Sequence, residues 1–578
     1  AAATAWEHQV TAAVAYSNNA ANTVLAPLPL PVLDGKAFTL VSVDVPAGPG
    51  LPDFQAMRLT GDQDVRIDFT KPANQIKGLD LNGNGVIAND GVENNITGRA
   101  ANFEIVDAYA RNPLNQFDIS QNFLGDISYD GTGFAGDGVS TNGNLVLGGL
   151  GADTILGGIG NDFLAGGGVA VANGGADSLQ GGRNADFFFA EFSLLDQTDG
   201  NASLNINGGS TSDDAAVGNN TPQDSDWLLI EASDDEDGTV INLAIEGVQS
   251  VTTGAGQVIG SMSEIEHVDA SGNLYGFLDD YNNVALGGGG HLTAAGENVG
   301  IGASAQLHII GSVANNILIG GYDNDLIEGG DGSDLLMGGN LNYAFNNPNA
   351  QGITNNGMDE LYGNDGADNL VWEADRGIYE GHTDLDVDDE APADANMANN
   401  DTLWLTREAL GTRTTAQLTT DGVLRFDLGV GKEGGLANYS GYGGADQNSS
   451  LNYTADQTNY VAGVARTTTA DMENVIATGL GAVDYRAAGS NNPDLAFNNQ
   501  QNHFAYNGDL DLRGTMGANT LYAAAGSDVV EGREGNDLLS GGEGNDDFIF
   551  ELAGSDGVDV IHRQTDVGNN LTDGTFGR

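Results

Sequence analysis

The sequence predicts an all-β fold in which parallel β-solenoid blocks alternate with other β-rich segments and contain little helix. Three observations support this prediction. Glycine and aspartate recur together at steps of nine residues. An apolar residue stands two positions after each of these aspartates, and helix-type periodicity is scarce. Such units must stack to build a core, because one unit alone buries too little apolar surface.

The composition points to a cation-binding protein. The 578 residues include 19 basic and 82 acidic side chains, which give a formal net charge of −63. Such a polyanion repels nucleic acid and anionic lipid, so we expect neither as a partner. Its self-repulsion requires a neutralising cation, and carboxylate and carbonyl oxygens select hard cations, calcium above all. The absence of cysteine excludes disulfides and thiolate metal sites.

The repeating unit has nine residues and is clearest in 148–156 (GGLGADTIL) and 157–165 (GGIGNDFLA). It occurs in three blocks, at about 148–189, 311–371 and 514–550. The aspartates at the sixth position of the unit are Asp153, Asp162, Asp177, Asp186, Asp325, Asp334, Asp359, Asp368, Asp528, Asp537 and Asp546.

The apolar position tests the register of this repeat. The residues two places after the aspartates are Ile155, Leu164, Leu179, Phe188, Ile327, Leu336, Leu361, Leu370, Val530, Leu539 and Phe548. All eleven are aliphatic or aromatic, which a random acidic, glycine-rich linker would not produce. The pattern therefore indicates a folded repeat with a thin apolar core.

The chemistry of the unit can be derived from its residue types. Paired glycines accept positive φ without a Cβ penalty and make a tight turn. The turn exposes backbone carbonyls, and the aspartate adds a carboxylate. The three residues after the turn form a short strand whose middle side chain points inward. Stacked aspartates need a counter-charge, so we predict cations between neighbouring turns.

This unit resembles the G-G-x-G-x-D-x-U-x nonapeptide of RTX (repeats-in-toxin, haemolysin-type) proteins, in which U is a large apolar residue. The resemblance covers about a quarter of the chain. It implies that the turns bind several calcium ions, that the tripeptides form a parallel β-roll, and that the eleven aspartates are calcium ligands. We expect weaker or empty sites where the turn pattern is broken, at Arg183, Tyr322, Ala523, Ala524 and Arg533.

Position within a block also matters. Asp162, Asp334 and Asp537 have repeat neighbours on both sides, so we expect each to contribute to ions shared with flanking turns. Asp186 stands at the end of its block by sequence, and we expect its loss to cost less.

A second calcium candidate lies near the start of the chain. Asp80, Asn82 and Asn84 place oxygens at positions 1, 3 and 5 of an EF-hand-like loop, with Gly85 at position 6. Position 12 is Gly91, where a bidentate acid belongs. A plain Asn/Gly turn explains the segment equally well.

The chain between the blocks carries β-type signals, as in Thr239–Leu243 and Thr402–Thr406. A longer repeat is also present, because Phe103–Ala108, Ile265–Ala270 and Met472–Ala477 resemble one another, and a glycine-rich block begins about 45 residues after each. The acidic stretch 384–401 is a loop candidate that could hold a further cation. We predict three modules, each a β-segment followed by a β-roll: 1–197, with the EF-like loop; 198–380; and 381–578, with the C-terminal tail.

No enzyme motif is evident. The seven histidines include no H-E-x-x-H pair, and the sequence has no G-x-S-x-G elbow or P-loop. We therefore expect a secreted calcium-binding structural protein of the bacterial cell surface or matrix: a surface layer, sheath, filament or adhesin segment. The alternative is an exported RTX enzyme, hydrolase or peroxidase-like, with catalytic residues in the non-RTX segments.

Export and assembly follow as further expectations. Ala1–His8 lacks the features of a general secretory signal, and the resemblance implies type I secretion to the extracellular space or cell surface. No apolar run approaches the roughly 20 residues of a membrane span. The apolar final repeat strand, Asp547–Phe550, offers an open edge, so we expect self-assembly into a filament or sheet. The segment Val558–Ile561 could instead cap this end.

Overall fold

The computed structural model describes the repeat blocks and the strands around them. The described residues are 28–29, 38–45, 54–61, 65–68, 76–78, 105–107, 127–130, 142–148, 152–159, 161–166, 176–183, 185–191, 204–209, 226–231, 238–244, 247–256, 258–270, 291–292, 298–299, 306–321, 324–339, 359–372, 378–380, 401–405, 423–428, 437–439, 467–470, 472–477, 508–515, 517–550 and 557–562.

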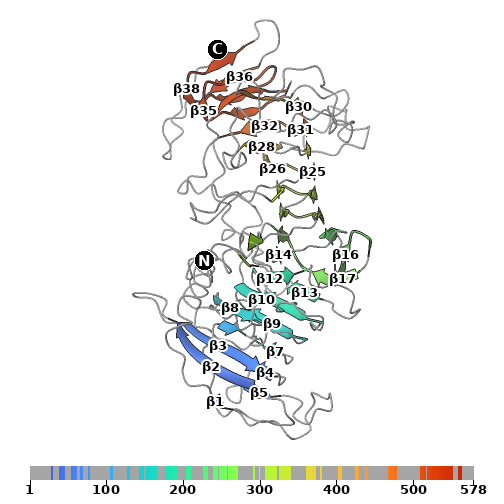
Figure 1. Ribbon diagram of the computed structural model, residues 1–578. Coiled ribbons are helices and arrows are strands. Elements are labelled where there is room, and N and C mark those ends of the chain that lie inside the picture. The colour runs from blue at the N-terminus through green and yellow to red at the C-terminus, as the bar shows by residue number, and fades with distance from the viewer. Residues whose placement is uncertain are drawn as a thin grey trace, which may run out of the picture. The chain divides into compact units, whose positions relative to one another are not determined.

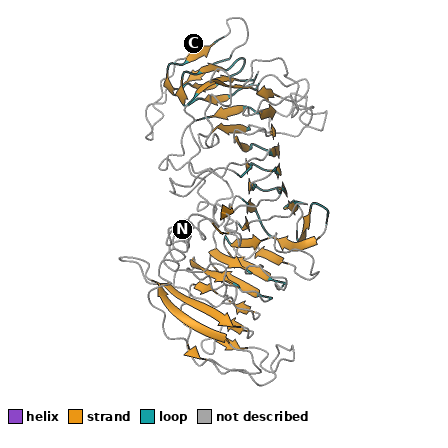
Figure 2. Cartoon of the chain, viewed as in Figure 1, coloured by secondary structure: helices purple, strands orange, loops and turns teal. Residues whose placement is uncertain are grey.

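The chain forms two compact units, residues 1–305 with 485–491 and residues 306–484 with 492–578. In the described residues all regular structure is β-strand, as Figure 2 shows, which confirms the predicted all-β class. No helix in this part of the chain could cross a membrane. The three-module boundaries at 197/198 and 380/381 stay a prediction.

In the first unit the chain alternates between two sheets (Figure 1). One sheet contains β1 (Leu28–Pro29), β2 (Phe38–Val45), β3 (Phe54–Gly61), β6 (Ile105–Asp107), β8 (Asn142–Leu147), β10 (Asn161–Ala165), β12 (Phe187–Glu191), β14 (Trp227–Glu231) and β18 (His267–Asp269). The other contains β4 (Val65–Asp68), β5 (Ile76–Gly78), β7 (Ile127–Asp130), β9 (Thr154–Ile159), β11 (Ser178–Arg183), β13 (Leu204–Gly209), β15 (Thr239–Asn242), β16 (Gln249–Thr253) and β17 (Val258–Ser263). A separate antiparallel pair joins β19 (His291–Leu292) and β20 (Asn298–Val299).

Strands from β8 to β14 show the winding most clearly. β8 pairs in parallel with β10, β10 with β12, and β12 with β14, while β9 pairs in parallel with β11, and β11 with β13. Each strand therefore pairs with the strand two places later in the chain. This alternation is a two-sided parallel β-roll, as predicted for the repeat blocks.

The second unit repeats the arrangement. One sheet contains β22 (Ile317–Ile319), β24 (Leu335–Met337), β26 (Asn369–Trp372), β28 (Thr402–Leu405), β32 (Asn474–Ile476), β34 (Thr520–Tyr522), β37 (Leu538–Ser540) and β40 (Val560–Ile561). A second contains β21 (Leu307–Ile310), β23 (Leu326–Asp331), β25 (Glu360–Asp365), β27 (Ile378–Glu380), β30 (Ala437–Tyr439) and β31 (Thr467–Ala470). A third contains β29 (Val423–Asp427), β33 (Asp509–Arg513), β36 (Val529–Glu531) and β39 (Asp547–Ile549), and two short strands in the turns are β35 (Ala525–Gly526) and β38 (Glu543–Gly544).

The core is a set of stacked apolar residues from the predicted position of the repeat. Leu336 lies in register with Leu370, and Ile327 lies in register with Leu361, and all four are fully buried. Ten of the eleven predicted residues are buried, and Phe548 on β39 is only half-buried. Among the described strands of its sheet β39 is the last, so Phe548 has a neighbouring rung on one side only.

The predicted strands between the blocks are also present. Thr239–Leu243 gives β15, and Thr402–Thr406 gives β28, which inserts as a rung between β26 and β32. The roll of the second unit therefore continues through chain that lacks the glycine-rich turn pattern. The insertions between rungs are long, but the strands return to the same register.

Candidate calcium-binding turns

The six turn residues of each repeat are numbered 1 to 6 here, from the first glycine to the aspartate. All eleven predicted aspartates lie in the described residues, and ten of them are buried; Asp546 is half-buried. Asp80, Asn82 and Asn84 lie outside the described residues, so the EF-hand-like candidate stays a prediction.

The position-6 carboxylates form ladders along the roll. The backbone N–H of Asp162 donates to Oδ1 of Asp186 at 2.7 Å, although the two residues are 24 apart in sequence. In the second unit Asp334 N–H donates to Asp368 Oδ1, also at 2.7 Å. Equivalent bonds end on Oδ1 of Asp177, Asp325, Asp334, Asp359, Asp528, Asp537 and Asp546. One oxygen of each aspartate is thus held by the backbone of the adjacent rung.

The second oxygen faces the inside of its own turn. At Asp334, Asp528 and Asp537 this oxygen, Oδ2, is buried and has no hydrogen-bond partner in the structure. A buried carboxylate without a partner is costly, because it has lost its hydration. These three oxygens therefore mark positions where a cation would be stabilised.

Glycine at position 1 creates the space for this oxygen. A Cβ built on Gly329 would overlap both Asp334 Oδ2 and the carbonyl oxygen of Gly363 in the next turn of the stack. Only glycine lets a carboxylate oxygen and a carbonyl oxygen approach the same point. Two oxygens of different turns gathered in this way are hard-cation ligands.

Electrostatics agree with the need for a cation. Burial raises the pKa of Asp334 to about 8; the hydrogen bond from Asn316 N–H opposes this rise, and the nearby carboxylates of Asp368 and Asp331 add to it. Burial likewise raises the pKa of Asp528 to about 7 and that of Asp537 to about 6. These ladder carboxylates therefore do not ionise readily without a counter-charge.

Side chains alone do not complete a metal site. In the described part of the chain no three His, Cys, Asp or Glu side chains come together as metal ligands. Each turn supplies one position-6 carboxylate, so an ion held there would draw further ligands from backbone carbonyls. The residues present fit calcium, which when bound would supply the counter-charge that the ladder lacks.

Turns that depart from the repeat pattern still enter the ladders. Ala523 and Ala524 replace a glycine pair, yet Asp528 Oδ1 accepts Leu510 N–H at 2.8 Å. The turn that contains Arg533 places Asp537 Oδ1 2.9 Å from Asn519 N. Tyr322 lies outside the described residues.

Several ladder residues were missed by the repeat pattern. Asp186 N–H donates to Asp226 Oδ1, Asp368 N–H to Asp401 Oδ1, and Asp537 N–H to Asp559 Oδ1. Asp186 is therefore the last aspartate of its repeat block but not the end of its ladder, and the expectation that its loss costs less than that of Asp162 stays a prediction. Asp226 and Asp401 lack the glycine turn, and Asp559 keeps only Gly554 and Gly557 of it. Each has an apolar residue two places later, a signal that could have found it: Leu228, Leu403 and Ile561.

Glutamates continue the ladder at two further rungs. Asp226 N–H donates to Glu266 Oε2 at 2.8 Å, and Asp401 N–H donates to Glu473 Oε2 at 2.9 Å. In return, Glu266 N–H donates to Asp226 O, and Glu473 N–H donates to Asp401 O, both at 3.1 Å. The similar sequence segments around Glu266 and Glu473 are thus structurally equivalent rungs.

Comparison with known families gives the same assignment. The RTX calcium-binding nonapeptide repeat matches the chain in four copies, at residues 140–170, 169–192, 310–342 and 513–548. The chain contains RTX calcium-binding repeats. No curated protein matches the sequence. The matched segments contain nine of the eleven predicted aspartates; Asp359 and Asp368 lie beyond them, but their rungs pair in parallel with those of Asp325 and Asp334.

Proposed function

We propose that this RTX-repeat protein is a secreted, calcium-binding structural protein of the bacterial cell surface or extracellular matrix. In this role it forms part of a surface layer, sheath, filament or adhesin, and has no catalytic activity of its own. Its roll blocks stay largely unfolded at the low calcium of the cytosol and fold outside. Extracellular modules bind calcium at roughly 10⁻⁴ to 10⁻³ M, which suits such a switch.

The observation that carries the proposal is that carboxylate ladders occur in both units. The first unit has Asp162, Asp186 and Asp226 in succession, and the second has Asp334, Asp368 and Asp401. Calcium-dependent folding of this extent would organise much of each unit. This distribution favours a structural role over a roll that serves only as an appendage of a catalytic domain.

Self-association is proposed through the open strand edge at β39. Among the described strands of its sheet β39 pairs only with β36. Ile549 is 38% exposed and Phe550 45% exposed at this edge. β40 extends the opposite sheet by pairing with β37, which supports a partial cap on that sheet alone. An unpaired apolar edge recruits further β-structure, here a second copy of the chain.

Two experiments test this function. A labelled antibody on the source cells should stain the surface, lose the signal on calcium chelation, and regain it when protein and calcium return. Light scattering of the purified chain should show assembly in millimolar calcium. Staining confined to the cytosol would exclude the structural role, and so would a chain that stays monomeric at high protein concentration in calcium. Hydrolase or peroxidase activity of the purified chain would favour the enzyme alternative.

A further inference from the structure

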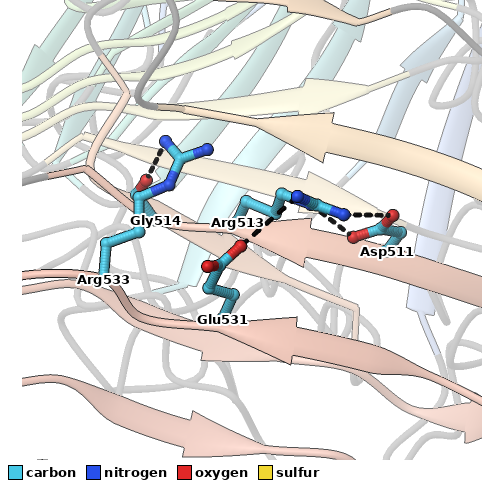
Figure 3. A network of polar contacts seen from close by, with 5 residues as sticks. All are labelled: Asp511, Arg513, Gly514, Glu531 and Arg533. Atoms are coloured by element: carbon cyan, nitrogen blue, oxygen red, sulfur yellow. Dashed lines mark hydrogen bonds and ion pairs between the residues drawn. The ribbon is translucent and has the colours of Figure 1, made fainter. Parts of the chain in front are cut away.

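An arginine lies between two stacked turns at the start of the third block. Turn 514–519 and turn 532–537 belong to adjacent rungs, because β34 pairs with β37 in parallel. Arg533 occupies position 2 of the second turn, and its Nη1 donates to the carbonyl oxygen of Gly514 at 2.8 Å (Figure 3). A positive charge from the protein thus reaches a position-1 carbonyl of the adjacent turn.

Position 2 is unusual for an arginine. Other turns have glycine here with positive φ, as at Gly330 (φ 101°) and Gly542 (φ 80°). Arg533 adopts φ 69°, and the other non-glycine residues with positive φ in the described chain are Glu264 and Asn364. This conformation disfavours a residue with a Cβ, so the side-chain contact must offset a backbone cost.

The facing turn, 514–519, has no carboxylate at position 6. Asn519 stands at position 6, and its Oδ1 accepts Thr515 N–H at 2.7 Å. The Thr515 hydroxyl accepts Gly517 N–H, and Asn519 Nδ2 donates to Glu473 O at 2.7 Å. The polar groups of this turn are therefore satisfied by the protein itself.

The second block contains a natural comparison. Turn 311–316 closes in the same way, with Ser312 N–H donating to Asn316 Oδ1 at 2.6 Å and Ala314 N–H donating to the Ser312 hydroxyl. The adjacent turn, 329–334, has Gly330 at position 2 and thus no side chain to reach across. A neutral turn occurs in both the second and the third block. Of these two blocks, the third has an arginine at position 2 of the adjacent turn, and the second has a glycine there.

We propose that the Arg533 guanidinium replaces a calcium ion between turns 514–519 and 532–537, so that this turn pair forms without calcium. The charge-assisted bond to Gly514 O supplies the attraction that an ion supplies elsewhere, and Asn519 removes the carboxylate that would require one. The third block then begins on a preformed turn pair, onto which its calcium-dependent turns stack. This inference rests on the proposed calcium-coupled folding of the other turns.

Hydrogen exchange of the full chain, followed peptide by peptide during a calcium titration, tests the proposal. In calcium-free buffer we expect residues 514–540 to stay more protected than residues 324–339. Arg533→Gln should abolish this difference and raise the calcium midpoint of 514–540 by about tenfold, the lower end of the scale for loss of a hydrogen bond to a charged group. Arg533→Lys, which keeps the charge, should restore part of the protection.

Arg513→Gln is the matched control. Arg513 belongs to the same network, with Nε 2.9 Å from Asp511 Oδ1 and Nη1 3.4 Å from Glu531 Oε2, but these ion pairs join residues of strands β33 and β36 and do not cross between the turns (Figure 3). Its loss removes one positive charge and should leave the midpoint of 514–540 unchanged. Equal shifts in the two glutamine variants would overturn the proposal.

A double variant restores the repeat residues at both positions. Asn519→Asp combined with Arg533→Gly restores the repeat pattern and should bind more calcium per chain than the unaltered protein, by a direct calcium-binding isotherm. An unchanged stoichiometry would contradict the proposal. If no peptide of the unaltered chain gains protection with calcium, calcium-coupled folding itself fails; if 324–339 responds and Arg533→Gln has no effect, only the arginine proposal fails.

Discussion

The backbone N–H of Asp334 donates to Oδ1 of Asp368 at 2.7 Å across 34 residues of sequence. Asp334 Oδ1 in turn accepts Asn316 N–H at 2.7 Å, and Asp334 Oδ2 is buried without a hydrogen-bond partner. One carboxylate thus joins two rungs through one oxygen and leaves the other for a cation. This division explains how the same residue can support both the strand register and calcium binding.

Asp334→Asn should change stability in opposite directions with and without calcium. The neutral amide removes a buried charge, so the second unit should keep more far-UV β signal in calcium-free buffer. It also removes a ligand, so the calcium midpoint should rise by on the order of tenfold, the scale of a bond to a charged group. Asp331→Asn, on the exposed end of β23, is the control: it relieves some repulsion on Asp334 but removes no buried oxygen, so it should shift both values far less. Identical behaviour of the two variants would argue against a cation at Asp334.

Leu336 tests the stacked core. Leu336 is fully buried and lies between Leu318 and Leu370 in the parallel sheet. Leu336→Ala should lower the free energy of unfolding in calcium by about 2–5 kcal/mol, because a cavity remains. Leu336→Asp should be worse, since it buries an unpaired charge. Val313→Ala, at an exposed turn residue, should stay within about 0.5 kcal/mol; equal losses at both sites in urea unfolding would exclude a stacked core.

Sequence reasoning recovered what depends on the repeat itself. The spacing of Asp162 and Leu164 predicted both the turn and the buried position, because one nonapeptide specifies both. Asp226 was missed because its rung has no glycine turn; the apolar Leu228 two places later is the one part of the pattern that it keeps, and its bond with Asp186 shows that it belongs to the ladder. The similarity of the sequence segments around Glu266 and Glu473 was visible in the sequence. That these glutamates join the ladder through their longer side chains could not be predicted, because this depends on the backbone positions.

Asp226 should matter as much as an aspartate inside the repeat pattern. Its Oδ1 holds the Asp186 backbone at 2.7 Å, and its own N–H is held by Glu266. Asp226→Ala should therefore raise the calcium midpoint of the first unit about as much as Asp162→Ala does. Hydrogen exchange of residues 185–191 provides the measurement. A wild-type midpoint in Asp226→Ala would restrict the functional ladder to the matched repeats.

Acid should partly replace calcium. The folded pKa values of Asp334, Asp528 and Asp537, about 8, 7 and 6, lie above the ordinary value of 3.8, so the folded state binds more protons than the unfolded state between these limits. The contribution of these groups to stability is complete below about pH 4 and is lost as the pH rises to about 8. In calcium-free buffer the far-UV β signal should thus be stronger at pH 5 than at pH 8. A signal that strengthens as the pH rises would contradict the assigned burial of these carboxylates.

Far-UV circular dichroism of the full chain tests the central claim most directly, that calcium folds the roll blocks. The spectrum is recorded in calcium-free buffer, after addition of calcium to about 1 mM, the upper range for extracellular modules, and after excess chelator. We expect β signal to appear with calcium and to disappear with chelator, while magnesium at the same concentration has little effect. A spectrum that is the same under all of these conditions would contradict the claim.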